Sequence, residues 1–229
     1  MSRQEAALCK ELNKIAGTVE EMLRTLPMSS KRSHRDIIPV SHGNRPLLPN
    51  LPPRKGRRPV TLRAALHLQC DGHGPQIYLE RLVKEVSSWP GVESLPSLVA
   101  PLQWHAMWVE EALASPEPSA FIYGHEFAHV LLGSTATIHV ALPLPSAHWA
   151  IVRGWAEPHF LNNRGLISPG VVLIYTPRDE DEYEICYRFF NASFQSALAP
   201  ETVCLSPSRE SPARHFDGVN TSGKRFSDF

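Results

Sequence analysis

The sequence shows no excess of charge of either sign and no long apolar run. Its 229 residues carry 23 Lys and Arg against 23 Asp and Glu, so the formal net charge is zero. A balanced charge gives no positive field for nucleic acid or an anionic membrane, so we expect no nucleic-acid partner. No segment approaches the ~20 apolar residues of a membrane-spanning helix, so we expect no membrane span. The N-terminus also lacks the apolar stretch of a secretory signal, and we therefore expect a soluble, cytoplasmic protein.

Cysteine is scarce and is not arranged in pairs. The chain has four cysteines, with no Cys-x-x-Cys pair and no spacing typical of a metal site. They are Cys9, Cys70, Cys186 and Cys204. We expect four reduced thiols, as in intracellular proteins.

Apolar residues and prolines are abundant. Hydrophobic residues make up 42% of the chain, which is enough for the core of one domain with tails. The 21 prolines disfavour an all-helical bundle, because proline breaks helix interiors, and they favour many short elements.

The pattern divides the chain into four parts. Residues 1–27 are predicted to form an amphipathic helix, because apolar residues recur there at spacings of four and three. This helix either packs on the body or forms a homodimer through a short seam. Residues 28–50 are a predicted linker, residues 51–200 a single domain, and residues 201–229 a disordered tail rich in Ser, Pro, Arg and Gly.

Within the domain, helices and strands are mixed. Helices are expected over 76–88, with Ile77 facing inward, and over 147–153, with Ser146 as the N-cap. A buried strand is expected over 171–175. The stretch 102–113 fits a strand or a helix equally well.

A long final helix is expected to reach about residue 199. Asp179 with Glu182 three residues on has the form of a capping box at its start. Five apolar residues make its predicted core face: Ile185, Cys186, Phe189, Phe190 and Phe194. The whole order predicts an α+β fold, an antiparallel β-sheet covered by helices on one face.

Polar residues gather in one mostly apolar stretch, Phe121 to His159, where a site is expected because unpaired buried polar groups are costly. One interpretation takes His125-Glu126-Phe127-Ala128-His129 as an H-E-x-x-H motif. On a helix, His125 and His129 would share a face and bind zinc while Glu126 polarised a water molecule. This hypothesis implies a zinc-dependent hydrolase.

The other interpretation makes the stretch a β-hairpin. Thr135–Leu142 alternates and is rich in β-branched residues, and Gly133-Ser134 supplies a turn. On a regular strand, Glu126 would face the same side as Ala128, with His129 on the other side.

The stretch also resembles the fungal luciferase family. The resemblance rests on Glu126-Phe127-Ala128-His129-Val130, on His139 ten residues later, and on Gly154-Trp155 with His159 at the family's spacing without gaps. The segment 174–180 resembles the family's Tyr-x-Pro-Arg-x-Glu-Glu motif. Weaker matches at 51–59 and 104–106 extend the similarity over roughly 51–199. The family's second histidine, two residues after the first, is replaced by Leu131, so part of the pocket is expected to be apolar.

The resemblance implies a set of site residues. His129 would be a catalytic base, with His139 and His159 orienting it or stabilising an oxyanion. Four further residues are candidates for substrate binding: Glu126, Trp155, Arg178 and His105.

The implied function is that of an enzyme of specialised metabolism. It would act on a phenolic, pyrone or polyketide-like small molecule by histidine-assisted proton abstraction. Oxygenation without a cofactor, or a redox-neutral cyclisation or isomerisation, would follow. We expect no cofactor and no bound metal, with zinc at His125 and His129 as the alternative. A third hypothesis is a non-catalytic protein that binds a small molecule in the same pocket.

Overall fold

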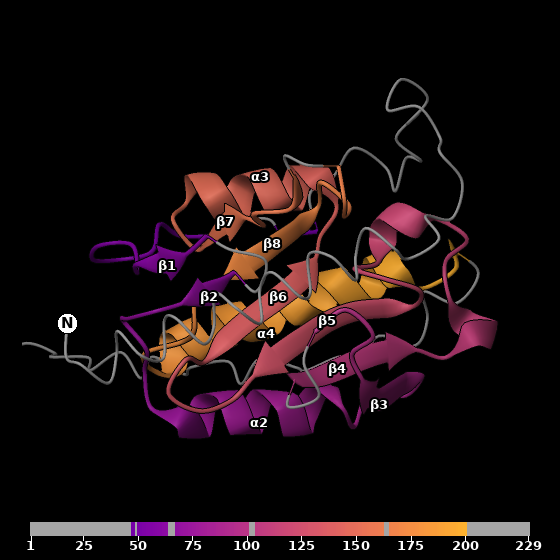
Figure 1. Ribbon diagram of the computed structural model, residues 1–229, viewed down its shortest axis with the longest axis horizontal. Helices are drawn as coiled ribbons and strands as arrows, with labels where there is room; N and C mark the ends of the chain where they lie inside the picture. The colour runs from indigo at the N-terminus through magenta and orange to yellow at the C-terminus, as the bar shows by residue number, and fades with distance from the viewer. Residues whose placement is uncertain (1–46, 49, 64–66, 101–103, 163–164, 201–229) are drawn as a thin grey trace, which may run out of the picture.

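The computed structural model describes residues 47–48, 50–63, 67–100, 104–162 and 165–200 (Figure 1). The expected N-terminal helix, most of the linker and the expected tail lie outside these residues. Dimerisation through that helix therefore stays a prediction.

A six-stranded antiparallel sheet forms the centre of the domain, in the order β3-β4-β5-β6-β8-β7 (Figure 1). Its strands are β3 (Val92–Pro96), β4 (Trp104–Val109), β5 (Glu126–Leu131), β6 (Thr137–Ala141), β7 (Ala156–Pro158) and β8 (Val171–Ile174). A separate two-stranded ribbon pairs β1 (Thr61–Leu62) with β2 (Leu68–Gln69). In the stretch 102–113, whose pattern fitted helix and strand equally, residues 104–109 form strand β4.

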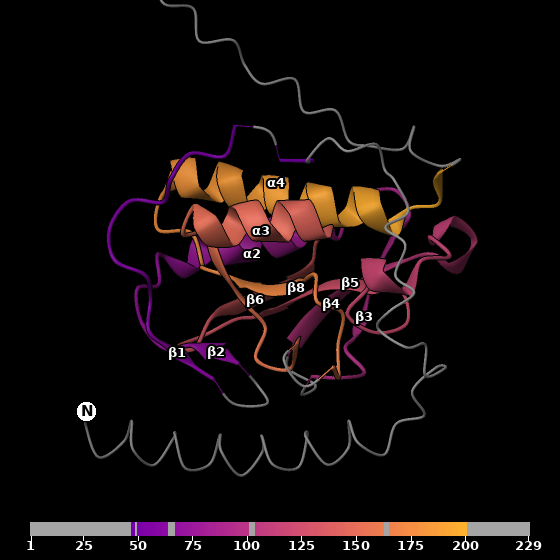
Figure 2. The same cartoon turned by 90° about the horizontal axis from the view of Figure 1, so that it is seen from above.

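Three α-helices of the described chain cover one face of the sheet, and the ribbon of β1 and β2 lies on the other side (Figure 2). They are α2 (Gln76–Val86), α3 (Leu144–Val152) and α4 (Glu180–Ala197), with short 3-10 turns at Glu111–Leu113 and Pro118–Ala120. Apolar residues of the helices and of the sheet form one core between the two layers. The predicted α+β fold is confirmed. Within the described ranges, no helix is both long and apolar enough to cross a membrane.

Helix α4 forms as its sequence predicts. The carboxylate of Asp179 accepts a hydrogen bond from the backbone N–H of Glu182, which caps the first turn. All five residues of the predicted core face are buried. The side chain of Glu182 turns instead to Arg54 and Arg178, so only half of a capping box is present.

Two local predictions about helices are wrong. Ile77 is 62% exposed, because the buried stripe of α2 runs through Leu79, Leu82 and Val86. Ser146 is not an N-cap, since α3 begins two residues earlier, directly after Pro143. Proline suits this position because it fixes the backbone and needs no partner for a missing N–H.

Strand β5 carries an irregularity that no pattern of alternation predicts. Glu126 and Ala128 lie opposite consecutive residues of β4, so Phe127 is one extra residue in the strand. Phe127 and Ala128 both join the core under the helices. Glu126 consequently faces the same side as His129, whereas the regular strand placed it with Ala128.

Candidate functional site

The hairpin of β5 and β6 brings two histidines together on the sheet face that the helices leave open. His129 and His139 are direct cross-strand partners, and their Nε2 and Nδ1 atoms are 2.8 Å apart. Both are buried. Cross-strand neighbours on one face are close enough for such contacts.

The bulge in β5 adds a carboxylate to this pair. Glu126 Oε1 lies 2.5 Å from His129 Nδ1, and the hydroxyl of Ser97 donates to the same carboxylate over 3.0 Å. Glu126 is fully buried, so these two partners replace the water it has lost. Had β5 been regular, Glu126 would point into the core under the helices.

The hydrogen bonds fix which nitrogen of His139 carries the proton. Its Nε2 is 3.0 Å from the carbonyl oxygen of His67, which can only accept, so Nε2 must donate. Burial first, and then the neighbouring His159 and His129, hold the pKa of His139 well below its usual range, so the ring is neutral. Nδ1 of His139 is then an acceptor, and Nε2 of His129 donates to it.

His159 reaches the same place from the residue after β7. Its ring lies 4.6 Å from that of His139, centroid to centroid. Its Nδ1 accepts a hydrogen bond from the backbone N–H of Leu161 at 3.2 Å. Burial, and then His67 and His129, lower the pKa of His159 well below its usual value, so the ring is neutral and carries one proton. Because Nδ1 is an acceptor, this proton sits on Nε2. Among the described residues, this N–H has no hydrogen-bond partner.

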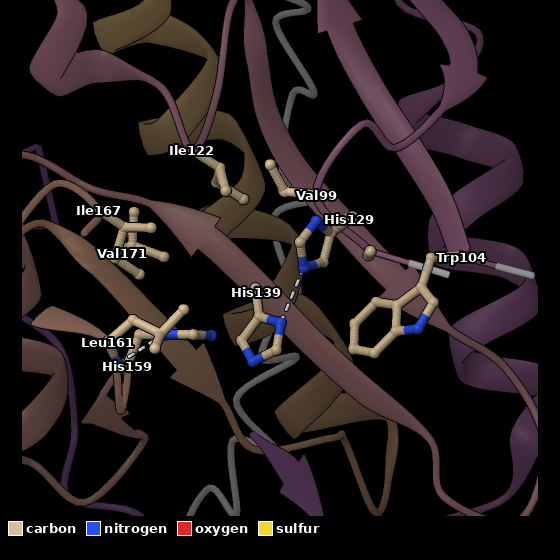
Figure 3. A pocket seen from close by; sticks show the side chains of 10 residues that line it. Val99, Trp104, Ile122, His129, His139, His159, Leu161, Ile167 and Val171 are labelled. Atoms are coloured by element: carbon tan, nitrogen blue, oxygen red, sulfur yellow. Dashed lines mark hydrogen bonds between the residues drawn. The ribbon is translucent and has the colours of Figure 1, made fainter. Parts of the chain in front are cut away.

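A small cavity lies against the three histidines (Figure 3). The indole of Trp104 stacks on His139, with the ring planes 8° apart, and meets His129 edge-on. The rest of the lining is aliphatic: Val99, Ala100, Ile122, Leu161, Ile167 and Val171. The enclosed space is about 30 Å³, so a ring-sized molecule enters only if the lining moves apart.

Sequence reasoning missed a second imidazole–carboxylate pair beside the cavity. His67 Nε2 donates to Glu157 Oε1 over 2.6 Å, and both residues are buried. Burial alone would raise the pKa of Glu157, but hydrogen bonds from His67 and Thr61, together with the charge of Arg63, lower this pKa to about 2. Glu157 is therefore a carboxylate at neutral pH.

None of the four predicted substrate-binding residues lines the cavity. Glu126 lies behind His129, which it contacts. Trp155 packs in the core near Phe189 and donates its indole N–H to the carbonyl of Pro52. Arg178 pairs through its guanidinium with the carboxylate of Glu182. His105 is exposed on β4, next to Trp104 in sequence but on the opposite face of that strand.

The helical interpretation of His125 to His129 is wrong, because these residues enter and form strand β5. The ring of His125 lies against Phe121, 5.4 Å between centroids, whereas His129 turns to Glu126 and His139. The two imidazoles therefore do not form the zinc pair of an H-E-x-x-H helix.

Comparisons with known proteins point to one family. Residues 124–193 match the family model described as the Luciferase domain, a range that contains β5, β6, His159 and most of α4. A curated protein described as "Luciferase" from Armillaria gallica is 27% identical over 164 residues. Over the part that holds β5, β6 and His159, the chain is similar to the luciferase family.

The chain spans only part of the length of this relative. The match covers 64% of the chain and 60% of the length of the Armillaria protein. No solved structure matches the chain. The resemblance inferred from Glu126 to His159 is confirmed at the level of the family.

Proposed function

We propose that the protein is an enzyme that acts on a phenolic, pyrone or polyketide-like small molecule by histidine-assisted proton abstraction. The substrate would be held in the cavity as its phenolate or enolate. This anion would then be oxygenated without a further cofactor, or undergo a redox-neutral cyclisation or isomerisation.

One observation carries the proposal: His159 faces the cavity with a ring N–H that can donate a hydrogen bond to a bound molecule. His159 is neutral and carries its proton on Nε2, which has no partner among the described residues. A neutral histidine can act as an electrophile by donating to an oxygen on which negative charge develops. Its hydrogen bond stabilises the anion and so lowers the pKa of the substrate hydroxyl.

For His129 we propose a different role from that of the expected base. Its Nε2 donates to His139, and its Nδ1 shares a proton with the carboxylate of Glu126. When that proton sits on His129, an imidazolium lies at the wall of the cavity and attracts an anion. His129 thus assists proton loss by charge, and the proton passes to water at the cavity mouth.

The apolar lining suits the rest of such a molecule. Trp104 offers a flat aromatic wall, and the aliphatic side chains exclude water around it. An enolate can react with dioxygen directly. A carbon–oxygen bond forms, the substrate carbon loses two electrons to dioxygen, and a proton from the medium completes a hydroperoxide. In a cyclisation or isomerisation the proton returns to another atom of the substrate and no oxidant is needed.

The proposal is tested with 4-nitrophenol, whose phenolate absorbs visible light. We expect its apparent pKa to fall by about one unit when it binds, because the cavity donates to the anion. The pKa is read from absorbance titrations at saturating protein. In His159→Phe, which keeps a ring but removes the donor, the shift should largely vanish.

His148→Phe is the matched control, since His148 is an exposed histidine of α3. It should keep the shift of the unchanged protein. A bound phenol whose pKa is unchanged or raised would contradict the proposal, as would a shift that survives in His159→Phe. A lowered pKa without turnover of any hydroxylated pyrone would favour the non-catalytic binding protein.

A further inference from the structure

A third imidazole completes a cluster at the bottom of the cavity. His67, His139 and His159 each offer a ring nitrogen within 4.8 Å of the other two, and all three residues are buried. We propose that these three histidines form a binding site for a divalent transition-metal ion of the zinc type. The site uses His67, which no sequence motif singled out, and does not use His125.

The arrangement is close to the geometry that such an ion needs. Zinc binds imidazole nitrogens at about 2.0–2.1 Å in a tetrahedron, which places ligand nitrogens roughly 3.4 Å apart. Since no two of the three nitrogens are more than 4.8 Å apart, they must approach one another by up to about 1.4 Å. The cavity of about 30 Å³ beside them has room for the fourth position, which a water molecule or an anionic oxygen would take.

His67 already has the environment of a metal ligand. Histidines that bind metals almost always donate their other N–H to a carboxylate or a carbonyl. Nε2 of His67 lies 2.6 Å from Glu157 Oε1, and Nδ1 faces a backbone N–H, so the proton is on Nε2 and Nδ1 keeps its lone pair. The backbone N–H of Phe160 is 3.4 Å from this Nδ1, a long contact that an ion can displace.

His139 is connected to the carboxylate of Glu126 by hydrogen bonds through the ring of His129. With an ion on its Nε2, Nδ1 of His139 would donate to Nε2 of His129, and Nδ1 of His129 to Glu126. These are the contacts already present, with the proton between the two rings moved from His129 to His139. The buried carboxylates of Glu126 and Glu157 would then supply two negative charges to balance the two positive charges of the ion.

The hydrogen bonds that must break set the cost of binding. His139 would leave the carbonyl of His67, and His159 would lose the N–H of Leu161 as its proton moves to Nδ1. The chain from Glu126 to His139 holds three protons when Nε2 of His139 donates, and two when an ion occupies that nitrogen. Binding therefore releases one proton per ion from this chain.

Three imidazoles select the kind of ion. Imidazole suits zinc, copper, iron and nickel, whereas magnesium and calcium prefer oxygen ligands. The carboxylates contact the histidine rings on the side away from the ion, Glu157 directly at His67 and Glu126 through His129. They position the rings and would not themselves be ligands, so the site offers the ion nitrogen atoms. We expect Zn²⁺ and Co²⁺ to bind and Mg²⁺ not to bind.

The experiment uses the full chain, stripped with a chelator, in the absence of any small-molecule substrate. It concerns the metal-bound state, in which Nε2 of His159 holds the ion, whereas the proposed function concerns the metal-free state, in which the same nitrogen donates a hydrogen bond. Failure of the one is therefore distinguishable from failure of the other. Calorimetric titration with Zn²⁺ should give one ion per chain, and Co²⁺ should give the visible absorption of a tetrahedral nitrogen site. His67→Gln should weaken binding at least 100-fold. Glu157→Gln, which keeps the shape and a hydrogen bond, should weaken it about 10–100-fold.

Two histidines outside the cluster serve as controls. His73→Gln and His125→Gln should bind Zn²⁺ as the unchanged protein does, because His73 bonds the carbonyl of Ala136 and His125 lies beside Phe121. Circular dichroism shows which variants are folded. If His67→Gln is unfolded, the zinc affinity of Glu157→Gln tests the proposal in its place. Equal affinity in Glu157→Gln and the unchanged protein, loss of binding in His125→Gln, or weak binding at several sites would each overturn the proposal.

Discussion

Replacing His139 by alanine is expected to remove most of the turnover of the protein's substrate, by roughly 100-fold or more. His139 accepts a hydrogen bond from His129, stacks on Trp104, and contacts the ring of His159. Its loss leaves Nε2 of His129 without an acceptor and opens a hole beside the donor of His159. One change therefore disturbs every polar group at the cavity.

Because His129, His139 and His159 contact one another, the effects of their single replacements on turnover should be non-additive. His129→Ala and His159→Ala should each cost about as much turnover as His139→Ala, and double changes little more, because groups serving one step fail together. Turnover is measured as product formed from a panel of hydroxylated pyrones. His125→Ala and His148→Ala, outside the cavity lining, should retain full rates.

Circular dichroism and thermal melting of the same samples separate lost chemistry from lost structure. If folded His129→Ala and His139→Ala both keep full turnover, the cavity is not the active site. If these variants are unfolded, the histidines serve the fold, and the catalytic assignment fails for that reason instead.

Glu182→Ala should be the most damaging single change to stability outside the sheet, lowering the free energy of unfolding by about 3–5 kcal/mol. The carboxylate lies 3.0 Å from the guanidinium of Arg54, and the two side chains are only 7% and 2% exposed. Nε and Nη1 of Arg54 already lack hydrogen-bond partners among the described residues. Without Glu182, the buried charge of Arg54 would keep, from the part of the chain that the structure describes, the carbonyl of Thr176 and two aromatic rings as neighbours.

The pKa of Glu182 agrees with this role. Burial would raise it, but Arg178 and Arg54 lower it below its usual value, so the group is ionised at neutral pH. Urea unfolding at pH 7 measures the effect. The control is Asp181→Ala, an exposed acid in the same helical turn, which should cost under about 1 kcal/mol. Equal losses in the two variants would show that the pair with Arg54 contributes nothing particular.

The sequence predicted the parts of the fold that follow from regular patterns. The β5–β6 hairpin followed from alternation and β-branched residues around Gly133, and α4 from its cap and its stripe of aromatic residues. The bulge at Phe127 could not be predicted, because one inserted residue leaves no mark on a short apolar strand. That bulge decides where Glu126 points, and with it the chemistry of His129.

Residues distant in sequence explain the other gaps. His67 directly precedes β2 and lies 72 positions from His139 in the sequence, so no local spacing connects the two. Glu157 lies two residues before His159, and residues two apart in an extended segment share a face. This alternation is the sequence signal that could have placed Glu157 near the cavity. Trp155 and Arg178 matched family positions but serve packing and a salt bridge here, because motif spacing does not specify which way a side chain turns.

The histidine network is tested most directly by ¹H–¹⁵N NMR of the imidazole rings in the metal-free protein. An exposed histidine is half protonated at about pH 6.5. Burial lowers the pKa of His139 and His159, so both should remain neutral at that pH, with the proton on Nε2. A ring of either residue that is charged at pH 6.5, or that carries its neutral proton on Nδ1, would contradict the network and the donor it presents to the cavity.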